Sequence, residues 1–126
     1  MNNKQESKRI LALVSDLLFT VKITDAAKRN GMQVDYVKTE EDFLSRLKPS
    51  APALVIMDLN IGSAEPVRLI ERLKQDSDLK SINVLSYVSH VQGELKVKAQ
   101  EAGSDLVMAR SAFSQNLQQI LKRHAG

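Results

Sequence analysis

Two aspartates, Asp16 and Asp58, each follow a short apolar run, and these placements carry the clearest chemical signal in the sequence. Asp58 follows the run Leu54–Met57, which contains two β-branched residues. A run this short and this apolar is typical of a strand buried on both faces of a parallel sheet. Because open α/β sheets place their ligands at the carboxyl ends of their strands, Asp58 is a candidate functional residue. The alternative is that Asp58 simply caps a loop.

The elements that would position these aspartates follow from the hydrophobic pattern along the chain. We expect strands over 9–14, 34–37, 54–60, 82–88 and 106–109. We expect helices over 17–30, from 39 to just before Pro49, from 63 or 64 through 73, over 91–102, and from 111 or 112 to 123. Five strands alternating with five helices predict an α/β fold whose parallel sheet is covered on both faces. At this size we expect a doubly wound, flavodoxin-like (βα)5 domain with strand order 2-1-3-4-5.

Helical spacing of apolar residues predicts which helix faces are buried. The first helix is expected to turn inward a broad face made of Leu18, Val21, Ile23, Ala26 and Ala27. The last helix is expected to turn inward Phe113, Leu117, Ile120 and Leu121.

In the expected strand order the first and third strands are neighbours, so Asp16 and Asp58 would meet at one edge of the sheet. Two converging carboxylates without His or Cys nearby suit a hard, oxygen-ligated cation such as Mg²⁺. A metal-screened aspartate can also attack a phosphoryl group as a nucleophile. The alternative is that the two carboxylates are merely solvated strand ends.

Composition limits the classes of function. The chain has 126 residues, 43% of them hydrophobic and 26% charged, which is typical of one soluble domain spanning 1–126 with a polar tail over 1–8. It has no Cys, and its two His are isolated, so thiolate chemistry and HExxH-type zinc sites are excluded. No apolar run is long enough for a membrane span, and we expect a cytoplasmic protein. The net charge of +3 is spread among acids, so we do not expect nucleic-acid binding.

Over about residues 9 to 123 the chain resembles a response-regulator receiver domain, the CheY-like domain of bacterial two-component signalling. The resemblance is carried by Asp16, by the apolar run ending at Asp58, by the Gly103-Ser104-Asp105 turn, and by the basic Arg110. It implies that Asp58 accepts phosphate from a histidine kinase. It also implies that Asp16, Asp58 and the backbone carbonyl of Asn60 bind Mg²⁺.

Several residues depart from the receiver pattern and indicate a divergent receiver or pseudo-receiver. Ser15 stands where the family has the first acid of its pair, and Val88 stands where it has a phosphate-binding Thr or Ser. Valine has nearly the same volume as threonine but donates no hydrogen bond. Arg110 replaces the family lysine, which keeps the charge but changes the geometry, and Val107 replaces a switch aromatic. Strand alternation places Ser86 on the face of Val88 but deeper in the sheet.

These departures lead to three functional hypotheses. The first is a stand-alone divergent receiver without enzyme activity, acting through protein–protein interaction with impaired phosphorylation of Asp58. The second is a receiver fully switched by phosphorylation. The third is an Asp-nucleophile phosphatase of the haloacid-dehalogenase type, but there Asn60 stands where a second aspartate should act as the acid, and an amide cannot donate that proton.

The resemblance also implies where a partner would bind. In the receiver family this is the surface of the fourth helix, the fifth strand and the fifth helix, which here would include Lys96, Lys98, Gln115 and Gln118. These residues can also be ordinary solvated helix positions. We expect that no output domain follows Gly126 and that the chain acts through a separate protein such as a histidine kinase.

Overall fold

The computed structural model describes residues 8–48, 50–89 and 93–124. Its strands are β1 (Arg9–Leu13), β2 (Gln33–Val37), β3 (Leu54–Asp58), β4 (Asn83–Val88) and β5 (Leu106–Ala109). Its helices are α1 (Leu17–Arg29), α2 (Glu40–Ser45), α3 (Pro66–Gln75), α4 (Gly93–Ala102), α5 (Arg110–Gln115) and α6 (Leu117–His124). The expected positions of the strands are confirmed to within two residues. None of these helices has the length and apolar character needed to cross a membrane.

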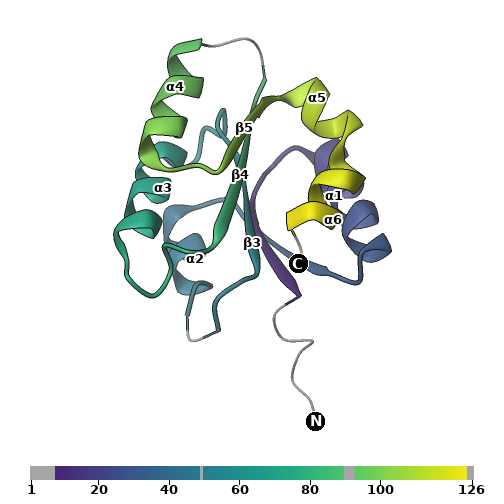
Figure 1. Ribbon diagram of the computed structural model, residues 1–126, viewed down its shortest axis with the longest axis horizontal. Helices are drawn as coiled ribbons and strands as arrows, with labels where there is room; N and C mark the ends of the chain where they lie inside the picture. Colours follow the sequence, from purple (N-terminus) through teal and green to yellow (C-terminus); the bar gives the residue numbers. More distant parts are fainter. Residues whose placement is uncertain (1–7, 49, 90–92, 125–126) are drawn as a thin grey trace.

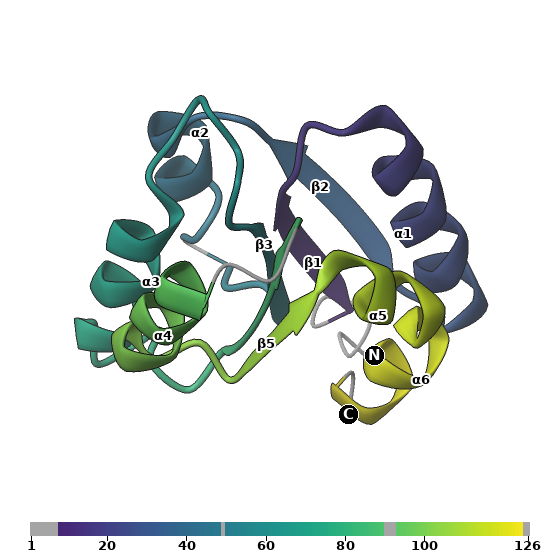
Figure 2. The ribbon, with the colours of Figure 1, turned by 90° about the horizontal axis from the view of Figure 1, so that it is seen from above.

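All four strand pairs are parallel, and the sheet has the expected order β2-β1-β3-β4-β5. Helices α2, α3 and α4 cover one face of the sheet, and α1, α5 and α6 cover the other (Figures 1 and 2). The flavodoxin-like fold is therefore confirmed. In the register of the central strands, Leu13 pairs with Met57 and Asp58 pairs with Tyr87. The residues that follow β1 and the end of β3 consequently lie at the same carboxyl edge.

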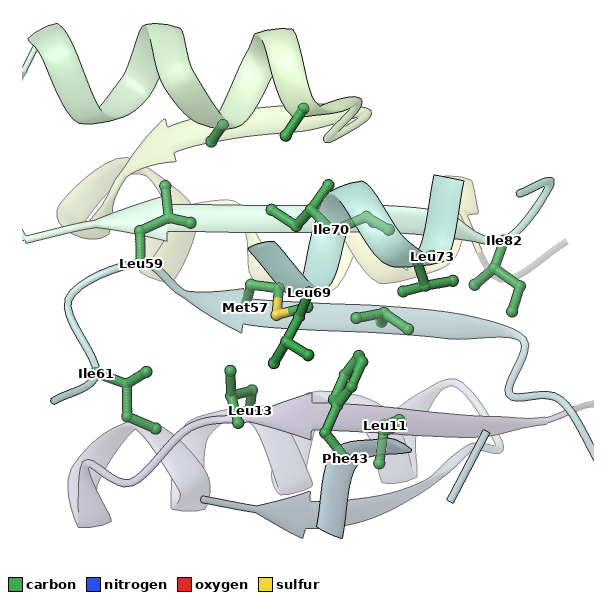
Figure 3. Packing of buried hydrophobic residues seen from close by; sticks show 14 of the residues in the cluster. Leu11, Leu13, Phe43, Met57, Leu59, Ile61, Leu69, Ile70, Leu73 and Ile82 are labelled. Carbon is green, nitrogen blue, oxygen red and sulfur yellow. The ribbon is translucent and has the colours of Figure 1, made fainter. Parts of the chain in front are cut away.

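The alternating side chains of the strands fill two separate cores. Under α2, α3 and α4 the core includes Phe43, Met57 and Leu69, all buried (Figure 3). Under α1, α5 and α6 it is built around the aromatic rings of Phe19 and Phe113, which pack with Tyr87. Because successive residues of a strand point to opposite faces, each strand contributes to both cores and holds the helix layers in register.

The buried face of α1 differs from the expectation. Leu18 and Val21 are 74% and 62% exposed, whereas Phe19 and Ile23 are buried with Ala26 and Ala27. The expected stripe left out Phe19, whose ring is the largest side chain available at the start of the helix. Once Phe19 enters the aromatic cluster, the helical repeat carries Leu18 and Val21 to the flanks of the helix.

The last helix also differs, because the single helix expected over 111–123 is divided at Asn116. The side-chain amide of Asn116 donates a 2.8 Å hydrogen bond to the carbonyl oxygen of Ala112, and its backbone leaves the helical conformation. A side chain that competes for helical carbonyls in this way bends or ends a helix. The expected inward residues Phe113, Leu117, Ile120 and Leu121 are nevertheless all buried. Helix α3 begins at Pro66, two or three residues later than expected, with proline at a position that needs no N–H donor.

The turn at Gly103 allows the chain to leave α4 and enter β5. Gly103 has a φ of +113°, and a Cβ atom added to it would lie 2.7 Å from Cγ of Lys74. Lys74 cannot move aside freely, because its ammonium group donates to the Ile82 carbonyl oxygen at 2.8 Å and to Asp105 at 2.9 Å. Steric contact and backbone strain therefore act together at this position.

We predict that Gly103→Ala lowers the free energy of unfolding by about 1–3 kcal/mol, the range for a residue forced into an unfavourable backbone conformation. Urea unfolding followed by circular dichroism measures this change. Gly62→Ala is the matched control, because a Cβ atom there meets nothing within 4 Å and φ is not positive. Equal stabilities for the two variants would contradict the account given for Gly103.

Candidate functional site

Asp58 is the last residue of β3 and lies at the carboxyl edge of the sheet. Asp58 is only 8% exposed, and its Oδ1 accepts a 2.9 Å hydrogen bond from the backbone N–H of Asn60. Burial raises the pKa of the Asp58 carboxyl, and the hydrogen bond from Asn60 opposes that shift. None of the ion pairs among the described residues includes Asp58. The carboxylate is therefore poorly compensated for its position.

Asp16 is the N-cap residue of α1, at the same edge of the sheet. One of its carboxylate oxygens accepts a 3.2 Å hydrogen bond from the backbone N–H of Phe19. The other oxygen forms an ion pair with the guanidinium group of Arg110. Both oxygens of Asp16 thus already have partners within the chain.

Arg110 is the first residue of α5 and directly follows β5. Its guanidinium carbon lies 4.7 Å from the centre of the Phe19 ring, a cation–π distance. The family resemblance implies that Arg110 supplies the positive charge of the lysine that it replaces. In the described part of the chain it pairs with Asp16, and no hydrogen bond or ion pair joins it to Asp58.

The remaining receiver positions offer few polar groups to Asp58. Val88 and Val107 are buried on the sheet face covered by α2, α3 and α4. Ser86 is fully buried, and its hydroxyl is 2.8 Å from the hydroxyl of Ser104 in the loop before β5. This partner ties the Ser86 hydroxyl to the interior of the sheet, as strand alternation predicts.

Asn60 has a role that the sequence interpretation missed. Its side-chain Oδ1 accepts a 2.7 Å hydrogen bond from the backbone N–H of Ser89, the residue after β4. Its own backbone N–H is the donor to Asp58. The side chain of Asn60 therefore connects the ends of β3 and β4. This role is separate from that of its backbone carbonyl, which is expected to bind a metal.

Tyr87 was also missed, although it pairs in register with Asp58. Its ring packs with those of Phe19 and Phe113 in a triangular cluster, at centroid distances of 4.5 and 5.2 Å from them. Its hydroxyl is buried and has no hydrogen-bond partner among the described residues. Burial, followed by the charge of Asp58 and the nearby Tyr36, raises the pKa of the Tyr87 hydroxyl, which keeps it neutral. The sequence feature that could have pointed to Tyr87 is its position as an aromatic residue directly before Val88 in the predicted strand.

The expected Mg²⁺ ligands do not form an open site in this arrangement. A hard cation needs several oxygen ligands, and both oxygens of Asp16 are engaged by Phe19 and Arg110. Within residues 8–48, 50–89 and 93–124, no group of three or more His, Asp or Glu side chains could hold a metal ion. While the Arg110–Asp16 pair is closed, the residues present therefore offer a divalent cation only an incomplete set of ligands.

A parallel (βα)5 sheet with a buried aspartate ending its third strand defines the CheY-like class of flavodoxin-like folds. A family model of the response regulator receiver domain matches residues 15–122. The chain therefore belongs to the response regulator receiver domain family, whose members work in two-component signalling. No curated protein matches it in sequence.

Several solved structures share the fold. The phosphorylated cyanobacterial phytochrome response regulator RcpA is 20% identical, with a TM-score of 0.78 over 92% of this chain and 89% of that one. The chemotaxis response regulator CheY4 of Vibrio cholerae is 15% identical, with a TM-score of 0.79 over 92% of this chain and 97% of that one. The Mn²⁺-bound form of response regulator Rcp1 is 16% identical, with a TM-score of 0.78 over 90% and 91%. Divalent metal binding thus occurs in structures with this fold.

The raised pKa of Asp58 gives a testable dependence of stability on pH. A carboxyl whose pKa is raised by folding binds its proton more tightly in the folded state, so its contribution to stability is lost as the pH rises through that pKa. We predict that Asp58→Asn raises the melting temperature at pH 7. This gain should disappear below about pH 4, where Asp58 is protonated in both the folded and unfolded states.

Asp76→Asn is the control of opposite sign. The backbone N–H of Asp78 donates to the Asp76 carboxylate at 2.8 Å and lowers the pKa of that carboxyl. Its ionised form stabilises the fold above its unfolded pKa, so Asp76→Asn should lower the melting temperature at pH 7. Thermal melts of both variants across pH 3–8 measure these changes. A fall for Asp58→Asn at pH 7 would show that the Asp58 carboxylate is compensated.

Proposed function

We propose that this chain is a divergent receiver that acts through protein–protein interaction, with phosphorylation of Asp58 impaired. The observation that carries this proposal is the pairing of Arg110 with Asp16, which leaves Asp58 without a described cationic partner. Val88 adds to it, because valine offers no hydroxyl at the position where the family binds the phosphoryl group. The chain's own residues therefore stabilise a phosphoryl group on Asp58 poorly.

Mg²⁺ would be held weakly by Asp16, Asp58 and the backbone carbonyl of Asn60. When bound, such a cation screens the charge of the carboxylate from the phosphoryl oxygens. The ion pair between Arg110 and Asp16 opposes this binding, because Arg110 must first release one carboxylate oxygen. We therefore propose a weak Mg²⁺ site.

The second candidate function is a receiver fully switched by phosphorylation. It is favoured by the position of Asp58, at the end of the buried strand β3 and beside the backbone N–H of Asn60. Turnover as a phosphatase is not supported, since Asn60 uses its side chain to bind Ser89 and cannot act as an acid. We propose that the chain is not an enzyme.

The two receiver hypotheses differ in how far Asp58 becomes phosphorylated. We predict that incubation with Mg²⁺ and a small phosphodonor gives little phosphoryl adduct by intact-mass spectrometry, and none in Asp58→Ala. Val88→Thr should raise the adduct yield about tenfold, the effect of one hydrogen bond worth about 1.4 kcal/mol. The physical reason is that threonine restores a hydroxyl donor for the phosphoryl oxygens.

Val84→Thr is the matched control for introducing a hydroxyl into β4. Val84 is buried on the same sheet face as Val88 but lies four residues deeper in the strand. It should leave the adduct yield unchanged. A stable, near-complete adduct in the wild-type chain that disappears in Asp58→Ala would overturn impairment and support the fully switched receiver.

We propose that the partner, a histidine kinase or another signalling protein, binds the surface formed by α4, β5 and the helices after β5. Val97 on α4 is an apolar side chain 48% exposed on this surface. A groove of about 340 Å³ runs along β5 and α6 and is lined by Leu106, Met108 and Ile120. Gln118 of the expected set is exposed, and its side chain accepts a 3.1 Å hydrogen bond from Asn30 at the end of α1. The expected cytoplasmic location and the absence of nucleic-acid binding stay predictions.

We predict that Val97→Glu lowers retention of a specific partner by about tenfold or more, because a charge at an apolar contact is costly to desolvate. The measurement is quantitative mass spectrometry of proteins that the immobilised chain retains from an extract of its source cells. Leu17→Glu is the matched control, since Leu17 is an exposed apolar residue at the start of α1 and lines a depression with Tyr36 and Lys38 that includes no residue of α4, β5 or the helices after β5. Loss of the partner only in Leu17→Glu would assign the interface to α1.

A further inference from the structure

The carboxylate of Asp16 is held on two sides by groups of the chain itself. The backbone N–H of Phe19 donates to one oxygen at 3.2 Å, and the guanidinium of Arg110 pairs with the other. These partners come from opposite ends of the sequence, since Arg110 is 94 positions away from Asp16. The ion pair thus joins the start of α1 to the start of α5 at the carboxyl edge.

Arg110 is fixed by more than its ion pair. Its guanidinium lies 4.7 Å from the centre of the Phe19 ring, and that ring is packed against Tyr87 in the core. A cation at the first position of a helix is disfavoured by the positive end of the helix dipole. The carboxylate of Asp16 compensates for this cost. Asp16 therefore caps α1 and at the same time offsets an unfavourable charge at the start of α5.

This arrangement has a direct consequence for cations. A divalent metal would compete with the guanidinium of Arg110 for the carboxylate of Asp16, whose other oxygen already accepts a hydrogen bond from the Phe19 N–H. Each carboxylate oxygen has two lone pairs, so the competition is mainly one of charge, because two cations at one carboxylate repel each other. The guanidinium of Arg110 therefore neutralises Asp16 and disfavours a second cation there.

We propose that Arg110 is a built-in cation that takes the place of a divalent metal at Asp16. Metal binds Asp16 only in those molecules in which the Arg110–Asp16 pair is open. The apparent dissociation constant for the metal equals the intrinsic constant divided by the open fraction. If the pair is open in about one molecule in ten, the wild-type chain binds metal about tenfold more weakly than a chain without Arg110. This inference concerns Asp16 and holds whether or not Asp58 is phosphorylated.

The test is a titration with Mn²⁺ alone, followed by the electron paramagnetic resonance signal of free Mn²⁺, with no phosphodonor present. Arg110→Gln keeps a polar side chain near Phe19 but removes the charge, and it should bind Mn²⁺ about tenfold more tightly than the wild-type chain. Adding Asp16→Asn to Arg110→Gln should remove the gain. Because no phosphoryl transfer is measured, the result is independent of the proposed impairment of Asp58.

Lys22→Ala is the matched control for general electrostatics. Lys22 lines the same surface depression as Arg110, but its ammonium group donates to the Ser114 hydroxyl at 3.0 Å rather than to Asp16. It should change the affinity for Mn²⁺ less than twofold. Equal affinities for Arg110→Gln and the wild-type chain, or an equal gain in Lys22→Ala, would overturn the proposal.

A second measurement on the wild-type chain avoids any question of whether a variant folds. Saturation with Mg²⁺ should shift the side-chain Nε–H resonance of Arg110 and the amide resonance of Phe19 together in nuclear magnetic resonance spectra. The shift would report release of the guanidinium from Asp16. An Arg110 resonance that stays fixed while other resonances at the edge titrate with Mg²⁺ would contradict competition for Asp16.

Discussion

Parallel pairing of β1 with β3 is the constraint on which the functional edge depends. Because Leu13 pairs with Met57, the chain leaves both strands at the same edge of the sheet. This register places Asp16 and Asp58 at that edge. A shift of one residue in either strand would send its side chains to the opposite face of the sheet. The register is protected by burial on both faces, since every residue of β3 is buried. The edge can therefore accept unusual polar residues without loss of the fold.

The same scaffold distributes the charges at this edge unevenly. Asp16 receives a cation and a backbone donor, whereas Asp58 receives a backbone donor and, within the described part of the chain, no cation. The reason is steric as much as electrostatic, because Phe19 provides a flat apolar surface on which the guanidinium of Arg110 rests. Arginine is well suited to this double contact, while lysine carries a compact charge without a planar face. The planar guanidinium of Arg110 can therefore contact the Phe19 ring and the Asp16 carboxylate at the same time.

The sequence was sufficient for the strand order, the edge and the candidate aspartates, because these depend on apolar runs and parallel connections. It was insufficient where a contact joins distant segments. The pairing of Arg110 with Asp16 needs the positions of α1 and α5, and the bond from Asn60 to Ser89 needs the ends of β3 and β4. The prediction of which face of α1 is buried was wrong for a local reason. Leu18 and Val21 fit an apolar stripe, but Phe19 fills the core better and sets the rotation of the helix.

The buried phenol of Tyr87 also gives the molecule an optical property. The chain has no Trp and only two Tyr, so its near-ultraviolet absorption and emission come almost entirely from Tyr36 and Tyr87. Tyr87 packs against two phenylalanine rings and is in register with Asp58. Tyr36 lies on the edge strand β2, and its hydroxyl is bonded to Thr24 and Thr20. Ionisation or occupation of Asp58 changes the electric field at the Tyr87 ring. The unlabelled chain thus carries its own spectroscopic reporter beside the aspartate.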